Sequence, residues 1–168
     1  MPYDSLPSYD MSDNETGCCP RFHPEGWDGL ELSFENKLFV RAETRSFFHI
    51  PLNYGAVFPR VQANLEAAGA FNPDDFLILS KEVNLFKEEH FFAAGRNVPG
   101  EEMTRLSGNF VSKVFEGPYQ NAKRWYDEMK SIARARGKPD GAVYFFYTTC
   151  PKCAKHYGKN YVVGFAEV

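Results

Sequence analysis

Long apolar runs are missing from this chain. No segment approaches about 18 consecutive apolar residues, the length that a membrane-spanning helix needs. The first residues, MPYDSLPSYDMSDNETG, hold neither a basic stretch nor an apolar run, so they lack the pattern of a secretory signal. We therefore expect a cytoplasmic protein with no membrane partner, in a compartment where thiols stay reduced.

An excess of positive charge is also missing. The chain has 19 Lys and Arg against 22 Asp and Glu, which gives a net charge of −3. Nucleic-acid-binding domains usually carry a basic surplus that attracts phosphates, so we expect no nucleic-acid partner. The motifs G-x-G-x-x-G, G-x-x-x-x-G-K-[ST] and G-x-S-x-G are absent as well, which disfavours nucleotide cofactors and an elbow-type serine nucleophile.

Aromatic residues are plentiful instead, with 16 Phe, 9 Tyr and 2 Trp among 168 residues. Such side chains fill a core, or they line a cavity for an apolar or cationic small molecule. The length predicts one domain. We expect residues 1–17, which are polar, to form a flexible tail and residues 18–168 to form the domain.

The domain has an internal repeat of element order, over about residues 36–98 and 104–168. In each stretch a strand leads into a proline-containing turn, a tyrosine (Tyr54 or Tyr119) and an amphipathic helix, and two more strands follow. Two β-α-β-β units of this kind predict an α+β fold. It would be an antiparallel sheet with two helices packed on it, related by a pseudo-twofold axis.

Some element boundaries follow from single residues. Pro59 favours a first helix that begins nearer Val57 than Tyr54, because proline is tolerated only in the first turn of a helix. The predicted strands after the two helices are 76–83, 90–95, 143–149 and 161–168, and an extra strand at 37–42 joins the first unit.

The run Phe115-Glu116-Gly117-Pro118-Tyr119, followed by Trp125, resembles the gyrase-inhibitor-like (GyrI-like) superfamily over about residues 36–168. This superfamily includes the effector-binding domains of AraC-type regulators. The segments GCCPRF, FFHIPLNYG, KVFEGPY and FFYTTCPKCAKHYGKNYVVGFAEV also look like a bacterial group labelled hydrolase. The resemblance implies an aromatic cleft on the pseudo-twofold axis, often with a buried glutamate, that binds bulky and frequently cationic molecules. Some stand-alone members resemble hydrolases of strained electrophilic compounds that use a Glu and a Tyr.

Two glutamates are candidate catalytic acids. Glu167 ends an apolar strand on the same face as Tyr161, Val163 and Phe165. Burial there would raise its pKa and make it a stronger base, whereas a solvated strand end is the alternative. Glu116 is the second candidate, and an exposed charge in a turn is its alternative.

Aromatic residues are the candidate ligand contacts. Tyr144 and Tyr147 lie on opposite faces of a strand, and the one that faces a cleft can donate a hydrogen bond to a developing oxyanion. We take Tyr147 as this catalytic donor. The predicted ligand-binding residues are Tyr119, Trp125, Tyr144 and His49, and the alternative for each is a structural role.

The four cysteines stand in two pairs, Cys18–Cys19 and Cys150–Cys153. Redox C-x-x-C pairs usually open a helix that lowers the thiol pKa, but a polar turn between two strands is expected here. A zinc site needs four ligands. Cys18 and Cys19 are the obvious partners of Cys150 and Cys153, although adjacent cysteines ligate together only with some strain, and Cys19 with His23 or His156 is the alternative. The sequence leaves two hypotheses, a closed structural zinc site and reduced, unliganded thiols.

These features predict a small hydrolase that acts on an apolar electrophilic molecule through a cleft carboxylate and a tyrosine. The alternatives are a non-catalytic protein that binds or sequesters an apolar or cationic small molecule, and a protein-interaction module of the same fold. The oligomeric state is unknown from sequence.

Overall fold

The structure is a computed structural model that describes residues 6–7, 10–47 and 50–168. Within them the strands are β1 (Glu31–Phe47), β2 (Ile50–Pro51), β3 (Ile78–Asn84), β4 (Lys87–Ala93), β5 (Glu102–Glu116), β6 (Val143–Tyr147) and β7 (Tyr161–Glu167). The helices are α1 (Tyr54–Ala67), α2 (Ala122–Ala135) and α3 (Pro151–Tyr157), with 3₁₀ turns at Pro73–Asp75 and Tyr119–Asn121.

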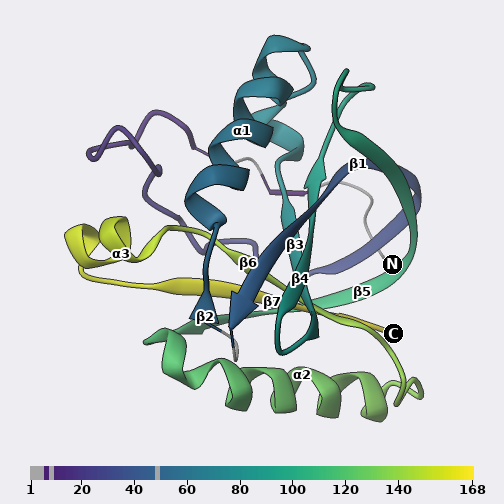
Figure 1. The fold of residues 1–168 in the computed structure, drawn as a ribbon. Helices are drawn as coiled ribbons and strands as arrows, with labels where there is room; N and C mark the ends of the chain where they lie inside the picture. The colour runs from purple at the N-terminus through teal and green to yellow at the C-terminus, as the bar shows by residue number, and fades with distance from the viewer. Residues whose placement is uncertain (1–5, 8–9, 48–49) are drawn as a thin grey trace.

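The strands form one antiparallel sheet that closes into a barrel (Figure 1). Their order is β2-β1-β4-β3-β6-β7-β5, and β1 also pairs with β5. Because β1 and β5 are long, each pairs with more than one strand along its length: β1 with β4 and β5, and β5 with β1 and β7. An irregularity between Phe34 and Lys37, where Asn36 has φ 52°, interrupts the β1–β5 register, and such bulges bend a strand as closure requires.

The predicted α+β class with an antiparallel sheet is confirmed. The chain runs β1, α1, β3, β4 and later β5, α2, β6, β7. One bridge between Ser80 and Phe145 joins β3 to β6, and the β1–β5 ladder joins the other edges of these two groups of strands. Helices α1 and α2 lie on the outside of the barrel at different positions around it (Figure 1).

Several predicted elements differ from the structure. Helix α1 begins at Tyr54 and holds Pro59 inside it, because the buried Val57, Val61 and Leu65 pack a continuous helical face on the sheet, which outweighs the cost of the proline. The strand expected at 37–42 is the middle of β1. The C-P-x-C segment forms helix α3 rather than a hairpin turn.

Aromatic side chains fill the inside of the barrel. Phe22 and Trp27, which precede β1, join this core and pack against Phe146 at ring-centroid distances of 6.3 and 5.6 Å. Leu6 is also buried there. Described residues of the 1–17 segment therefore contact the body of the protein, while the tail boundary itself remains a prediction.

Each long helix packs on the outer face of the sheet. On α2, Trp125 is 2% exposed and stacks on Phe115 of β5, with ring centroids 5.4 Å apart. Gly164 of β7 lies directly under Met129, so that a Cβ at this position would be 2.8 Å from its sulfur. The glycine therefore permits the close approach of α2 to the sheet.

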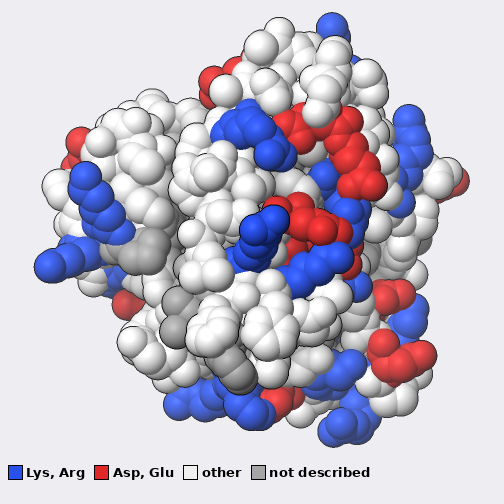
Figure 2. All heavy atoms as spheres, viewed as in Figure 1, with Lys and Arg blue, Asp and Glu red and all other residues white. Residues whose placement is uncertain are grey.

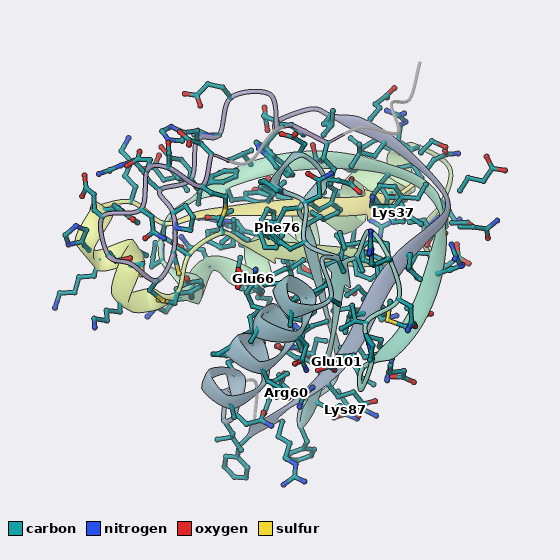
Figure 3. The ribbon with its side chains drawn as sticks, turned by 90° about the horizontal axis from the view of Figure 1, so that it is seen from above. Lys37, Arg60, Glu66, Phe76, Lys87 and Glu101 are labelled. Atoms are coloured by element: carbon teal, nitrogen blue, oxygen red, sulfur yellow. The ribbon has the colours of Figure 1, made fainter. Side chains whose placement is uncertain are left out.

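Charged residues tie the elements together at the surface. Arg60 of α1 reaches Glu101, which precedes β5, at 3.1 Å, and Figure 3 shows the two labelled side chains near each other. Arg41 of β1 forms hydrogen bonds to Glu43, Glu89 and Glu102 at 2.6–2.8 Å. Acidic and basic atoms intermingle on the face shown in Figure 2. Among the described residues, no helix has the length and apolar character of a membrane span.

Candidate functional site

A buried polar cluster lies on the outer face of β1, β3 and β4. The alternation of side chains places Thr44, Ser80 and His90 on the same face as the apolar residues under α1. The His90 ring forms two hydrogen bonds, each 2.7 Å long: Nε2 to Thr44 Oγ1, and Nδ1 to Ser80 Oγ. All three residues are at most 5% exposed. A polar group buried in an otherwise apolar interface is the feature that most needs an explanation.

The His90 imidazole is neutral at physiological pH. Burial lowers its pKa from 6.5 to about 4, because a charged ring would lose its hydration. A neutral imidazole has one donor and one acceptor nitrogen, which two hydroxyl partners satisfy in either tautomer. The rings of Tyr54 and Phe58 on α1 pack edge-on against the His90 ring, with centroids 5.1 and 4.8 Å away. Together with the hydrogen bonds to Thr44 and Ser80, they fix the orientation of the imidazole.

Glu88 brings a carboxylate to this cluster. Its Oε2 lies 3.7 Å from His90 Nε2, and the side chain is 14% exposed. Sequence reasoning missed Glu88, because the strand was expected to begin at His90. The signal was the alternation of Glu88, His90 and Phe92, which places the acid on the same face as a buried aromatic.

Two tyrosines lie on the outer face of the barrel under α2. The rings of Tyr119 and Tyr147 are 5.9 Å apart, and both pack against the apolar cluster under α2. Burial raises the pKa of Tyr147, and the charge of Glu88 adds to the increase. The Tyr119 hydroxyl donates to the Thr149 carbonyl at 2.7 Å, and burial raises its pKa to about 12. Both are therefore neutral hydrogen-bond donors.

The pKa of Glu167 is lowered, whereas a desolvated base would have a raised pKa. Burial acts to raise the pKa, but hydrogen bonds from the Lys138 ammonium and from the Ala142 backbone N–H lower it overall. Lys138 Nζ lies 2.5 Å from Glu167 Oε1. The fold supplies both partners through the turn after α2, so Glu167 is an ion-paired carboxylate rather than a desolvated base.

The other predicted residues are divided between positions. Glu116 pairs with Tyr161 at one end of the β5–β7 ladder, and Glu167 pairs with Phe110 at the other, so the two acids do not share a site. Tyr144 faces the barrel interior, whereas Trp125, Tyr119 and Tyr147 meet on the outer face. Trp125 is buried in that contact. His49 lies outside the described residues.

Two surface hollows lie elsewhere. One of about 210 Å³ is next to α3, and the other, of about 280 Å³, is near the C-terminal residue. None of the residues that line these hollows was predicted to bind ligand. Their lining includes Arg21, His23, Tyr157 and Lys159 in the first, and Glu31, Asn109, Arg136 and Val168 in the second.

The four cysteines converge, as predicted. Their sulfur atoms all lie within 4.8 Å of one another. The expectation that no helix follows Cys150 was wrong, since Cys150 is the N-cap of α3. Burial raises the pKa of Cys19. Burial also acts to raise that of Cys153, but hydrogen bonds, first from Thr16, lower it to about 7. Such a set of four sulfur donors is able to hold a soft metal ion.

Comparison with known protein families finds a match over most of the chain. The family model described as "Bacterial hydrolase" matches residues 9–168. No curated protein and no solved structure matches the chain. The matched range covers nearly all of the sequence and includes the four cysteines, the barrel strands and the polar cluster. The chain therefore belongs to the bacterial hydrolase family.

Proposed function

We propose that this protein is a hydrolase of a small, apolar, electrophilic molecule, and that its site is the outer sheet face around Glu88, His90 and Tyr147. The observation that carries the proposal is the Glu88–His90 pair, with 3.7 Å between carboxylate and imidazole, set among buried hydroxyls beneath aromatic rings. Family membership supports the hydrolytic class. The GyrI-like arrangement, with two β-α-β-β units about a pseudo-twofold axis, is part of the same proposal and is supported by the order of strands and helices.

Glu88 is the group best suited to act on water. As a carboxylate it accepts a proton from a water molecule, while the water oxygen forms a bond to the electrophilic carbon of the substrate. The bond from that carbon to its leaving oxygen breaks in the same reaction, and the oxygen takes up a proton. Glu88, protonated by the first step, returns this proton, so the carboxylate is regenerated.

The neighbouring side chains hold the His90 ring in place and stabilise the charge that develops in the reaction. Thr44 and Ser80 fix the His90 ring, and the neutral ring gives Glu88 a polar neighbour that does not neutralise its charge. The Tyr147 hydroxyl remains protonated because its pKa is raised, so it can donate a hydrogen bond to the oxygen on which negative charge develops. Tyr54 and Phe58, which pack on His90, offer aromatic surface to an apolar substrate.

A second candidate function is binding without turnover. The same carboxylate among aromatic rings also suits a hydrophobic cation, because charge and ring faces both attract it. The interaction-module alternative is favoured by a different feature, the exposed apolar side chains Phe47, Leu52 and Phe86, which are 51–62% exposed. The cysteine cluster takes no part in any of these proposals, and a zinc ion there would be structural.

The test is turnover and binding of a panel of epoxides, lactones, activated esters and hydrophobic cations. Wild type and Glu88→Gln are compared, with Glu167→Gln and Glu116→Gln as matched controls that remove a carboxylate elsewhere on the sheet. We expect Glu88→Gln to lower kcat by about 100-fold or more and to leave the affinity for neutral panel members within about twofold.

The outcomes separate the candidates. Turnover that is retained in Glu88→Gln, or that is lost equally in a control variant, contradicts the assignment of Glu88. No turnover by wild type, together with weaker binding of cations alone in Glu88→Gln, supports the binder. A Tyr147→Phe variant that lowers kcat without changing binding supports the proposed hydrogen bond to the oxyanion.

A further inference from the structure

The four cysteine sulfurs have the spacing of a metal site. All lie within 4.8 Å of one another, and Cys18 Sγ is 3.7 Å from Cys19 Sγ. Four thiolates that surround zinc at about 2.3 Å in a tetrahedron are separated by about 3.8 Å. The sulfurs therefore need to move by about 1 Å or less to enclose one ion, and no change in the path of the chain is required.

The backbone prepares each pair of ligands. Cys150 caps α3 and Cys153 lies one turn into the helix, so their side chains project from the same end. At the other pair, the Thr16 hydroxyl accepts hydrogen bonds from the backbone N–H groups of Cys18 and Cys19 at 3.2 and 3.3 Å. This tight turn brings adjacent cysteine sulfurs to one side of the chain, which removes the main objection to a vicinal pair of ligands.

Outer contacts support the sulfurs, as they do in established metal sites. The Cys150 backbone N–H points to Cys19 Sγ at 3.5 Å, and the Thr16 hydroxyl lies 3.2 Å from Cys153 Sγ. The Tyr157 hydroxyl donates to the Cys19 carbonyl at 2.6 Å. These contacts join segments that are more than 130 residues apart in the sequence.

We propose that Cys18, Cys19, Cys150 and Cys153 together bind one zinc ion, which clasps the N-terminal segment to α3. Tetrahedral sulfur sites select zinc among the common divalent ions, and four protein ligands leave no open position for a substrate. Convergence of all four sulfurs on one point is what an ion requires, whereas two separate disulfides would need only pairwise approach.

The clasp has a mechanical role. Residues 19–27 lead from the cysteines to Phe22 and Trp27, which are buried in the barrel core. The ion therefore fixes the segment that carries these two core residues. Arg21 lies between the clasp and Phe22, with its guanidinium 4.5 Å from the centre of the Tyr157 ring, so its protection from protease depends on the clasp.

Metal content tests the proposal directly. Wild type purified without chelator should contain one zinc per chain by elemental analysis. After exchange with Co²⁺ it should show thiolate-to-metal charge transfer and the visible bands of tetrahedral cobalt. Cys18→Ser and Cys150→Ser should each weaken zinc binding by more than about 100-fold, since loss of an outer partner alone typically costs about 10- to 100-fold. His23→Asn and His156→Asn are matched controls and should retain one zinc.

A second measurement needs no cysteine variant. Chelation of wild type should accelerate tryptic cleavage after Arg21 and leave cleavage after Arg134, within α2, unchanged. Absence of zinc and of the cobalt spectrum overturns the proposal. So does a measured protein mass about 2 or 4 Da below that of the reduced chain, which would show one or two disulfides. So does a zinc content that survives the cysteine substitutions, or one that is lost in a histidine control. Equal cleavage after Arg21 with and without chelator overturns the clasp.

Discussion

The buried His90 predicts a specific loss of stability in acid. Its pKa is lowered from 6.5 to about 4 in the folded protein, so between these values the unfolded chain binds a proton that the folded chain excludes. The contribution to stability is complete above pH 6.5 and is lost as the pH falls toward 4. The difference of about 2.5 pKa units corresponds to about 3 kcal/mol of unfolding free energy. Glu88, at 3.7 Å, would pair with the protonated ring, so this figure is an upper bound.

Urea unfolding of wild type and His90→Gln between pH 7.5 and 4 measures this effect. Glutamine retains hydrogen-bonding groups for the two hydroxyls but does not titrate, and subtraction of the two curves removes the carboxylates common to both. We expect wild type to lose up to about 3 kcal/mol more than His90→Gln over this range. The exposed His23, replaced by Gln, is the control and should follow wild type. Parallel curves for wild type and His90→Gln would refute the reasoning, because His90 would then titrate equally in both states.

Three substitutions test the packing of α2 and its approach to the cysteine segment. Trp125→Ala removes the ring stacked on Phe115 and should cost about 3–5 kcal/mol in urea unfolding; a cost below about 1 kcal/mol would show that the interface is not the packed core described here. Gly164→Ala places a methyl group against Met129 and should cost about 1–3 kcal/mol, whereas unchanged stability would mean that the helix can shift freely. Tyr119→Phe removes a donor to a backbone carbonyl and should cost about 1 kcal/mol, and a stabilised variant would contradict that hydrogen bond.

The sequence predicted the elements that have a strong pattern. Strand β7 was expected at 161–168 and occupies Tyr161–Glu167, because its apolar residues face the barrel interior on one side and α2 on the other. Convergence of the cysteines was predictable because a zinc site requires four ligands and the chain has only two pairs. The expected absence of nucleic-acid and membrane partners, and the cytoplasmic location, stay predictions.

Tertiary contacts decided what the sequence did not show. Helix α3 is only one to two turns long, and its polar residues have no helical period to detect; its start depends on Cys150 and its end on Gly158 with φ 77°. Glu88 is a charged residue near a hairpin, which is usually exposed. Its burial depends on distant residues, since the β1 ladder and the α1 rings surround its neighbour His90. Alternation along β4 places Glu88 on the same face as His90, but it does not reveal that α1 packs on that face.

The location of the substrate is the most direct test of the proposed site. A crystal of Glu88→Gln soaked with a panel compound that wild type hydrolyses would trap the uncleaved substrate. We predict electron density between α1 and α2 with the reacting group within hydrogen-bond distance of Gln at position 88 and of the Tyr147 hydroxyl. Density bound instead beside Glu167, or in the hollow next to α3, would contradict the account.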